Sequence, residues 1–135
     1  MNAVPKPSFK LRKPKYIKIN DIAPGKHCYH VYAKIVSLTK TESVNNNGEK
    51  FEVAEGRLGD ESGVANFLLR GPHAANLEEG QIVSLRNGKS NVVNDHIRLE
   101  LDRFGKVSQE PDVQIESVDL NNDISAEEYV LKRRR

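Results

Sequence analysis

Between residues 31 and 105 the sequence places apolar residues at every second position, and this spacing restricts the fold more than any other feature of the chain. It is clearest from His96 to Leu101, where Ile97, Leu99 and Leu101 alternate with polar residues. Successive side chains of a β-strand point to opposite faces, so a period of two indicates strands with one buried and one exposed face. We therefore expect an all-β core.

Three of the predicted strands lie in the first half of this region. Their inward residues are expected to be Val31, Ala33 and Ile35 in the first strand, Ala54, Gly56 and Leu58 in the second, and Ala65, Phe67 and Leu69 in the third. The segment from Asp60 to Gly63 joins the second strand to the third. We expect a positive φ at Gly63, which would close a short antiparallel hairpin.

A helical connector is expected next. Gly71-Pro72 ends the third strand, and the segment from His73 to Glu79 has the length of a short helix that Gly80 would close in a left-handed cap. A fourth strand from Gln81 to Arg86 and the fifth strand from His96 follow. This element order is that of the OB fold, whose barrel pairs its own strand edges. We predict an all-β, five-stranded OB-fold barrel with a short helix between strands three and four.

The two ends of the chain carry opposite charges, which predicts three regions. Residues 1–15 form a basic arm that prolines keep extended, residues 16–107 form the barrel, and residues 108–135 form an acidic segment with a basic end. The arm either assists nucleic-acid binding or acts as a solubilising tail. Its cations expected to assist binding are Lys10, Arg12, Lys13 and Lys15.

The acidic segment contains one helix signal. Ser125 and Glu128 have the spacing of a capping box, which predicts a short helix from Ser125 to Lys132. The segment either folds back and competes with nucleic acid for the basic ends of the chain, or keeps the protein soluble.

Several classes of protein are excluded or disfavoured by the composition. The apolar runs are a few residues long, whereas a membrane-spanning helix needs about 20. The single cysteine, Cys28, cannot form an internal disulfide, which favours an intracellular protein of the nucleus or cytoplasm. The group from His27 to His30 lacks the second ligand pair of a zinc site, and no catalytic motif or phosphate-binding glycine loop is present. We expect no enzyme activity, metal or cofactor.

Four short motifs follow one another along the chain: Tyr16-Ile17-Lys18-Ile19, Gly59 to Gly63, Leu85 to Lys89, and Asp102 to Val107. In this order they resemble the single-stranded-DNA-binding, replication-protein-A-like OB proteins of plants and protists, over about Lys15 to Leu131.

More distantly, the chain is similar to the OB subunit of metazoan sensor-of-single-strand complexes. Those relatives carry base-stacking aromatic residues where this chain has Arg70, Lys89, Val93 and Glu100. The resemblance implies a single-strand binder, and the missing aromatics imply that affinity relies on charge and on arginine planes that stack on bases.

The ligand surface of an OB barrel is the outward face of strands two and three, beside the loops after strands one and four. Cations on this face can meet phosphates, and Asn66 can offer a donor and an acceptor to a base edge. The predicted nucleic-acid-binding residues are Lys34, Phe51, Arg57, Asn66, Arg70, Arg86 and Lys89.

Three further aromatic residues need separate interpretations. Phe51, at the rim of a loop from Thr39 to Lys50, and Tyr32, on the outer side of the first strand, either stack on bases or pack against neighbouring segments. Phe104 is expected to be structural, at the end of the barrel.

The function predicted from these features is non-enzymatic binding of single-stranded DNA or RNA through the barrel face, with weak sequence preference. Two alternatives remain open. The barrel is a protein-interaction subunit of a larger complex whose groove binds a peptide or a partner's helix, or it is an RNA-associated factor of translation or of a ribonucleoprotein. No oligomeric state is predicted.

Overall fold

A computed structural model describes residues 16–129, without the side chains of His27, Asp102 and Arg103. The basic arm of residues 1–15 and the basic end from Lys132 to Arg135 lie outside the described residues. The elements are β1 (Tyr16–Ile17), the 3-10 turn η1 (Ile19–Asp21), β2 (His27–Val44), β3 (Lys50–Asp60), β4 (Gly63–Arg70), the 3-10 turn η2 (Gly71–Ala74), β5 (Ile82–Val93) and β6 (His96–Gln109). Within residues 16–129, no helix has the length and apolar character needed to span a membrane.

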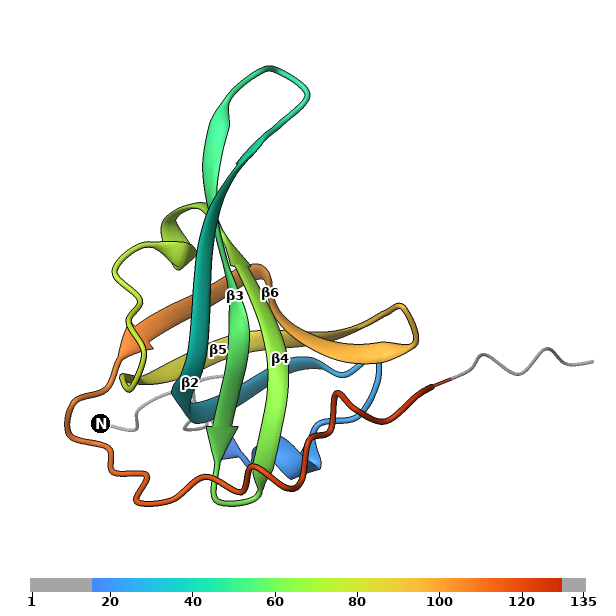
Figure 1. Ribbon diagram of the computed structural model, residues 1–135, viewed down its shortest axis with the longest axis vertical. Coiled ribbons are helices and arrows are strands. Elements are labelled where there is room, and N and C mark those ends of the chain that lie inside the picture. The colour runs from blue at the N-terminus through green and yellow to red at the C-terminus, as the bar shows by residue number, and fades with distance from the viewer. Residues whose placement is uncertain (1–15, 130–135) are drawn as a thin grey trace, which may run out of the picture.

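The sheet closes on itself because β2 is paired along both of its edges. The strand order is β1-β2-β3-β4-β6-β5, and an additional β2–β5 pairing joins the ends into a barrel (Figure 1). The first half of β2 pairs with β5, whereas its second half pairs with β3. The predicted OB-fold barrel is confirmed, with the two-residue strand β1 added in parallel to β2.

The alternating apolar residues fill the barrel as predicted. Val31, Ala33 and Ile35 of β2 are at most 1% exposed, as are Leu58 of β3 and Phe67 of β4. Gly56, expected in the core, has a different role, since a Cβ there would lie 2.0 Å from the backbone oxygen of Ser37. The β2 register shifts between Ile35 and Ser37, and only a glycine lets β3 approach this irregularity so closely.

Two strand pairs extend beyond the predicted strands and project from the barrel (Figure 1). The expected loop from Thr39 to Lys50 is instead mostly strand, and the turn occupies only residues 45–49. There the Asn45 Oδ1 accepts hydrogen bonds from the backbone N–H groups of Asn47 and Glu49, both at 2.9 Å. β5 and β6 are joined by Asn94 and Asp95, both at positive φ, which residues with short polar side chains tolerate in a two-residue hairpin turn.

The hairpin between β3 and β4 is confirmed, but the prediction of a positive φ at Gly63 is wrong. Gly63 is the first residue of β4, pairs with Asp60, and is absent from the positive-φ residues of the described chain. The turn consists of Glu61 and Ser62, and the Asp60 Oδ1 accepts from the Ser62 N–H at 2.8 Å. A side chain at Gly63 would collide with the backbone oxygen of Asn122, so glycine is needed there for close approach.

The expected helix from His73 to Glu79 is also wrong in extent. The helical connector is the single 3-10 turn η2, which begins at Gly71 and contains Pro72. Asn76 has a φ of 62°, which no helix accommodates, and residues 75–81 continue as a loop. The left-handed conformation predicted for Gly80 is present, at a φ of 85°, although Gly80 caps no helix.

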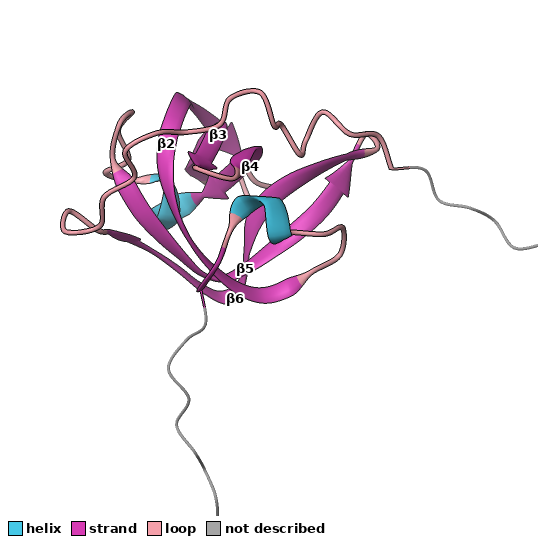
Figure 2. Ribbon diagram, turned by 90° about the horizontal axis from the view of Figure 1, so that it is seen from below, coloured by secondary structure: helices cyan, strands magenta, loops and turns pink. Residues whose placement is uncertain are grey.

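Residues 110–129 form an irregular segment, here called the strap, that crosses the end of the barrel from β6 to the β5–β6 hairpin (Figures 1 and 2). The Asp119 N–H donates to the Asp60 oxygen at 3.1 Å, and the Tyr129 N–H donates to the Asp95 oxygen at 2.7 Å. Between them, Val64 exchanges two backbone hydrogen bonds with Asn122 and Ile124, each 2.9 Å long. The strap therefore extends the sheet beside the first half of β4.

The predicted helix from Ser125 to Lys132 is not formed over residues 125–129, the part that the structure describes. The Ser125 hydroxyl, expected to cap that helix, instead accepts from the Asn66 N–H at 2.8 Å and donates to the Ile97 oxygen at 2.6 Å. The capping group is used in a tertiary contact. Phe104 is a further correction, because it lies within β6 and is 77% exposed rather than packed at the barrel end.

Asp60 joins three parts of the fold at the base of the barrel. Its carboxylate is 1% exposed and accepts hydrogen bonds from the Ile19 N–H at 2.9 Å, the Ser62 N–H at 2.8 Å and the Ser62 hydroxyl at 2.6 Å. Its backbone oxygen holds the strap through Asp119.

We expect Asp60→Ala to lower the free energy of unfolding by about 2–4 kcal/mol, because buried donors lose a charged acceptor. Urea unfolding followed by circular dichroism measures this change. Asp112→Ala, at an exposed position of the strap, is the matched control and should cost less than about 0.5 kcal/mol. Equal losses for the two variants would contradict this role for Asp60.

Candidate nucleic-acid interface

The outward side chains of β3, β4 and β6 form one continuous surface, because residues in register across a sheet share a face. Arg57 of β3 is in register with Asn66 of β4, which is in register with Arg98 of β6. The next row contains Glu55, Leu68 and Glu100, and Arg70 lies beyond it. Asn91 and Lys89 of β5 extend the two rows, opposite Arg98 and Glu100. This surface, here called the β3–β4 face, consists of Glu55, Arg57, Asn66, Leu68, Arg70, Lys89, Asn91, Arg98 and Glu100.

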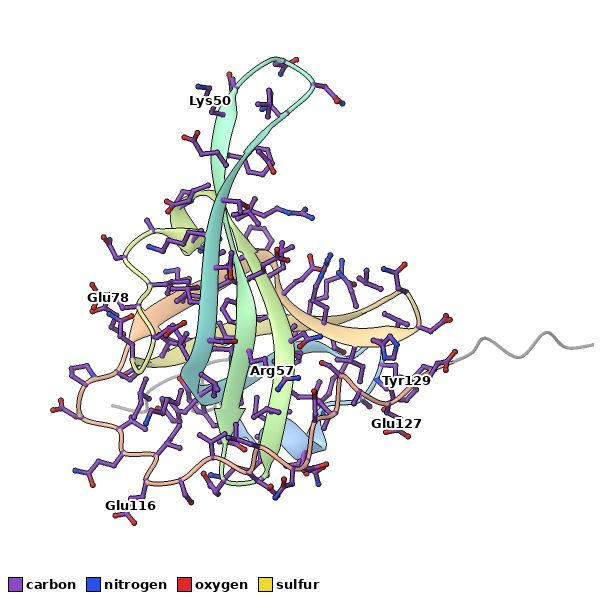
Figure 3. The ribbon with its side chains drawn as sticks, in the orientation of Figure 1. Lys50, Arg57, Glu78, Glu116, Glu127 and Tyr129 are labelled. Carbon is purple, nitrogen blue, oxygen red and sulfur yellow. The ribbon has the colours of Figure 1, made fainter. Side chains whose placement is uncertain are left out.

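The strap reaches this face at Arg57. The Arg57 guanidinium donates to the Asp123 carboxylate at 3.0 Å, and 46% of the arginine side chain stays exposed. Figure 3 shows Arg57 on the side of β3 along which the strap passes. The acidic segment thus folds back onto a cation of the barrel, whereas the competition expected from the sequence concerned the basic ends of the chain, which lie outside the described residues.

An open hollow of about 480 Å³ lies beside this ion pair. Asn66 stands in it with an exposed side chain, and its backbone N–H is held by Ser125. The wall of the hollow is completed by the β5–β6 hairpin and the strap: Val93, Asn94, His96, Ile97, Arg98, Asp123, Ser125 and Ala126. The Asn66 amide and the other polar groups that line this hollow can hydrogen-bond to a base edge.

Arg98 and Glu100 form the second ion pair of the face. Two nitrogens of the Arg98 guanidinium donate to one Glu100 oxygen, at 2.8 and 3.0 Å, and the Asn91 amide donates to the same oxygen at 2.9 Å. Burial raises the pKa of Glu100, but the hydrogen bonds from Asn91 and Arg98 outweigh it and hold this pKa below its usual value. Glu100 is therefore ionised at neutral pH and neutralises Arg98.

Arg70 and Lys89 have no ion-pair partner within 4.0 Å among the described side chains, although both lie near Glu100. Arg70 is exposed at the edge of a smaller hollow of about 120 Å³ that Leu68, His73 and Leu101 also line. These two cations are the groups of the face best placed to meet phosphates.

The remaining predicted site residues lie elsewhere. Lys34 occupies the base of the outward surface, opposite Gly59, where it lines a hollow with Glu79 and residues 116–118 of the strap. Phe51 lies six positions before Arg57, on the same side of β3, but it is half-buried within the projecting hairpin. Arg86 points from a different wall of the barrel, beside His30 and Lys106. The structure therefore gathers Arg57, Asn66, Arg70 and Lys89, and separates them from Lys34, Phe51 and Arg86.

Arg98, Asn91 and Asp123 were not among the predicted site residues. The alternation in β6 had already placed Arg98 outward, so that signal was present in the sequence. The pairing of Arg57 with Asp123 joins residues 66 positions apart, and no local pattern marks it.

A closed barrel of this topology, with its polar outward surface between two hairpins, defines the chain as an OB-fold protein. Residues 22–109 match the family described as "Single-stranded DNA binding protein Ssb-like, OB fold". The chain belongs to this Ssb-like family of single-stranded DNA binding proteins.

Similar proteins agree with this assignment. The single-stranded DNA binding protein Ssb of Saccharolobus solfataricus is 21% identical over 92 residues, which are 68% of this chain and 62% of that protein. The solution structure of a hypothetical protein from Arabidopsis thaliana has a TM-score of 0.74 at 21% identity, covering 100% of this chain and 99% of that chain. The second OB-fold domain of replication protein A from Methanococcus maripaludis has a TM-score of 0.59 at 18% identity, covering 74% and 99%. The predicted likeness to single-stranded-DNA-binding, replication-protein-A-like OB proteins is confirmed.

We expect Ser125→Ala to detach the strap from the barrel beside Asn66. Its buried hydroxyl joins β4 to β6, so the loss leaves one donor and one acceptor without a partner and should cost about 1–3 kcal/mol. Hydrogen exchange followed by NMR should show faster exchange of the Asn66 amide. In Ser117→Ala, at an exposed position of the same strap, that amide should exchange as in the wild type. Unchanged exchange in both variants would show that the hydroxyl does not hold the strap.

Proposed function

We propose that this protein binds single-stranded DNA through the β3–β4 face, with weak sequence preference and without catalysing a reaction. The observation that carries the proposal is that Arg57, Asn66 and Arg70 are all exposed on the outward face of β3 and β4. OB folds bind oligonucleotides on this face. Membership in the Ssb-like family supports the same target.

The chemistry of the face accounts for weak sequence preference. Arg70 and Lys89 meet phosphates, which every sequence shares. Asn66 is the residue able to distinguish base edges, because its amide both donates and accepts hydrogen bonds. With two of the four cations of the face, Arg57 and Arg98, already ion-paired, affinity at physiological salt is moderate.

The proposal predicts a measurable dependence on salt. If about four to six phosphates are engaged by the face and the termini, the logarithm of affinity falls with the logarithm of salt concentration at a slope of about −3 to −4. Fluorescence anisotropy of labelled dT15, titrated at several NaCl concentrations, gives this slope. No binding at low salt would end the proposal.

The variant Arg70→Gln tests whether the β3–β4 face is the DNA-binding site. The variant should weaken dT15 binding about two- to five-fold and make the slope shallower by about 0.7, the share of one phosphate on a single strand. Lys18→Gln is the matched control, because it removes the same charge next to η1, where Lys18 pairs with Glu61. Equal effects of the two variants would indicate that only the total charge matters and that the face is not the site.

The strap should act as an internal competitor for Arg57. In Asp123→Asn the Oδ1 that accepts the Ser125 N–H is kept, whereas the charge facing Arg57 is lost. We expect dT15 affinity to rise about two- to five-fold, as the release of a partly exposed ion pair of about 0.5–1 kcal/mol implies. Glu116→Gln, a strap carboxylate away from Arg57, should leave the affinity unchanged (Figure 3). An affinity that stays constant or falls in Asp123→Asn would contradict competition.

RNA is tested by the same assay. The 2′-hydroxyl adds a donor and an acceptor at each nucleotide, so a protein built for RNA binds rU15 more tightly than dU15. The proposal for DNA expects similar affinities for the two strands or tighter binding of dU15. A preference of more than about ten-fold for rU15 would reassign the protein to RNA.

A further inference from the structure

A second surface lies on the wall of the barrel formed by β1, β2 and the first half of β5 with the end of β6. Tyr16 of β1 is in register with His30 of β2, and Arg86 of β5 is in register with Lys106 of β6. Tyr32 follows His30 by two positions and therefore shares its side of β2. Phe104 lies where the register between β5 and β6 shifts; it is exposed, and its backbone oxygen accepts from the Asn87 side chain at 3.3 Å, next to Arg86. The aromatic wall consists of Tyr16, His30, Tyr32, Arg86, Phe104 and Lys106.

The rings on this wall are already arranged in a stack. The Tyr16 and Tyr32 ring centroids are 4.0 Å apart with an angle of 2° between the ring planes. The His30 ring lies 5.7 Å from Tyr16 at 45°. A parallel pair of rings presents flat π-surfaces, on which a nucleobase extends the stack.

The surroundings of His30 and Tyr32 favour the uncharged form of each ring. The Asn87 N–H donates to the His30 Nδ1 at 3.1 Å, while burial and then the nearby Arg86 lower the pKa of His30. Hydrogen bonding to Tyr16 and then burial raise the pKa of Tyr32. At neutral pH the wall therefore contains uncharged rings.

The charges beside the rings are mostly positive. Arg86 and Lys106 are both exposed, and neither has an ion-pair partner within 4.0 Å among the described side chains. The carboxylate near Tyr32 is Glu110, whose Oε1 accepts from the Ser84 hydroxyl at 2.9 Å. Rings flanked by cations match the bases and phosphates of a single strand.

The β3–β4 face differs from the aromatic wall in its aromatic rings and in the pairing of its cations. The residues that make up that face include no aromatic ring, Phe51 is half-buried in the projecting hairpin, and two arginines of the face are ion-paired. The aromatic wall, in contrast, carries Phe104, which is 77% exposed, together with the stacked tyrosines. The groups that stack on bases are thus gathered on the wall and not on the face.

We propose that the aromatic wall is a second binding surface for single-stranded DNA, on which bases stack against the Tyr16–Tyr32 pair and Phe104 while Arg86 and Lys106 hold phosphates. This inference rests on the proposed function, because the same strand continues from the β3–β4 face. Lys89 and Arg86 are three residues apart on β5, about 10 Å along the strand. A DNA strand that is too long to fit on the β3–β4 face alone can continue along β5 to the aromatic wall.

The test uses dT20 carrying 5-iododeoxyuridine for ultraviolet crosslinking, and a double variant of two exposed wall residues, Phe104→Ser with Arg86→Gln. The matched control is Leu120→Ser with Lys18→Gln, which removes another exposed large apolar side chain and one charge elsewhere. Thermal unfolding midpoints of both double variants should equal that of the wild type, since the replaced side chains are exposed.

We expect crosslinks to Tyr32 or Phe104, identified by mass spectrometry. The wall variant should bind dT20 about 5- to 30-fold more weakly than the wild type, the loss of one stacked base and one phosphate contact, while the control stays within two-fold. Crosslinks confined to Phe51 and other residues of β3 and β4, with the wall variant binding like the wild type, would overturn the second surface and leave the proposed function standing. If wild-type protein binds no dT20 at low salt, the proposed function fails and the second surface with it.

Discussion

The closure of the sheet by β2 is the constraint on which the rest of the molecule depends. β2 hydrogen-bonds to β5 along its first half and to β3 along its second half, so one long strand joins both sides of the barrel. The opposite seam, between β4 and β6, is held by two residue pairs, Asn66 with Arg98 and Phe67 with Leu99. Because this seam is so short, β6 leaves the backbone N–H and C=O groups in the first half of β4 unpaired. An open strand edge of this kind must be covered by another segment, since it could otherwise pair with another chain.

The strap covers the open edge of β4 and also changes the charge of the β3–β4 face. Its residues 122–125 supply the missing hydrogen bonds to Val64 and Asn66, and the Ser125 hydroxyl joins them to Ile97. Because the strap must lie there, Asp123 reaches Arg57. The structural completion of the barrel and the partial neutralisation of the β3–β4 face thus have one cause. In the aromatic wall, no ion pair joins Arg86 or Lys106 to the strap among the described side chains, and both cations are exposed.

Much of this arrangement could be predicted from the period of two. The alternation correctly placed Arg57, Asn66 and Arg70 outward, and it placed Phe67 and Leu58 in the core. Two predictions from local patterns were wrong because the residue concerned contacts a segment far away in the sequence. Ser125 has the spacing of a helix cap but binds Asn66 and Ile97, and Gly63 resembles a turn glycine but makes room for Asn122. The assignment of Phe104 to the barrel end failed because β6 continues to Gln109.

Local patterning was sufficient for the all-β class, for the order of the elements and for the side of each strand that faces solvent, because side-chain direction along a strand follows from backbone geometry alone. It could not show which outward residues share a wall. Arg86 and Lys89 are three positions apart and face different surfaces, and Lys34 lies on the outward side yet at the base, beside the strap. Those outcomes depend on the register shifts at Ile35–Ser37 and Arg86–Gly88 and on the path of the strap. Both are set by contacts between residues far apart in the chain, which exist only once the barrel has closed.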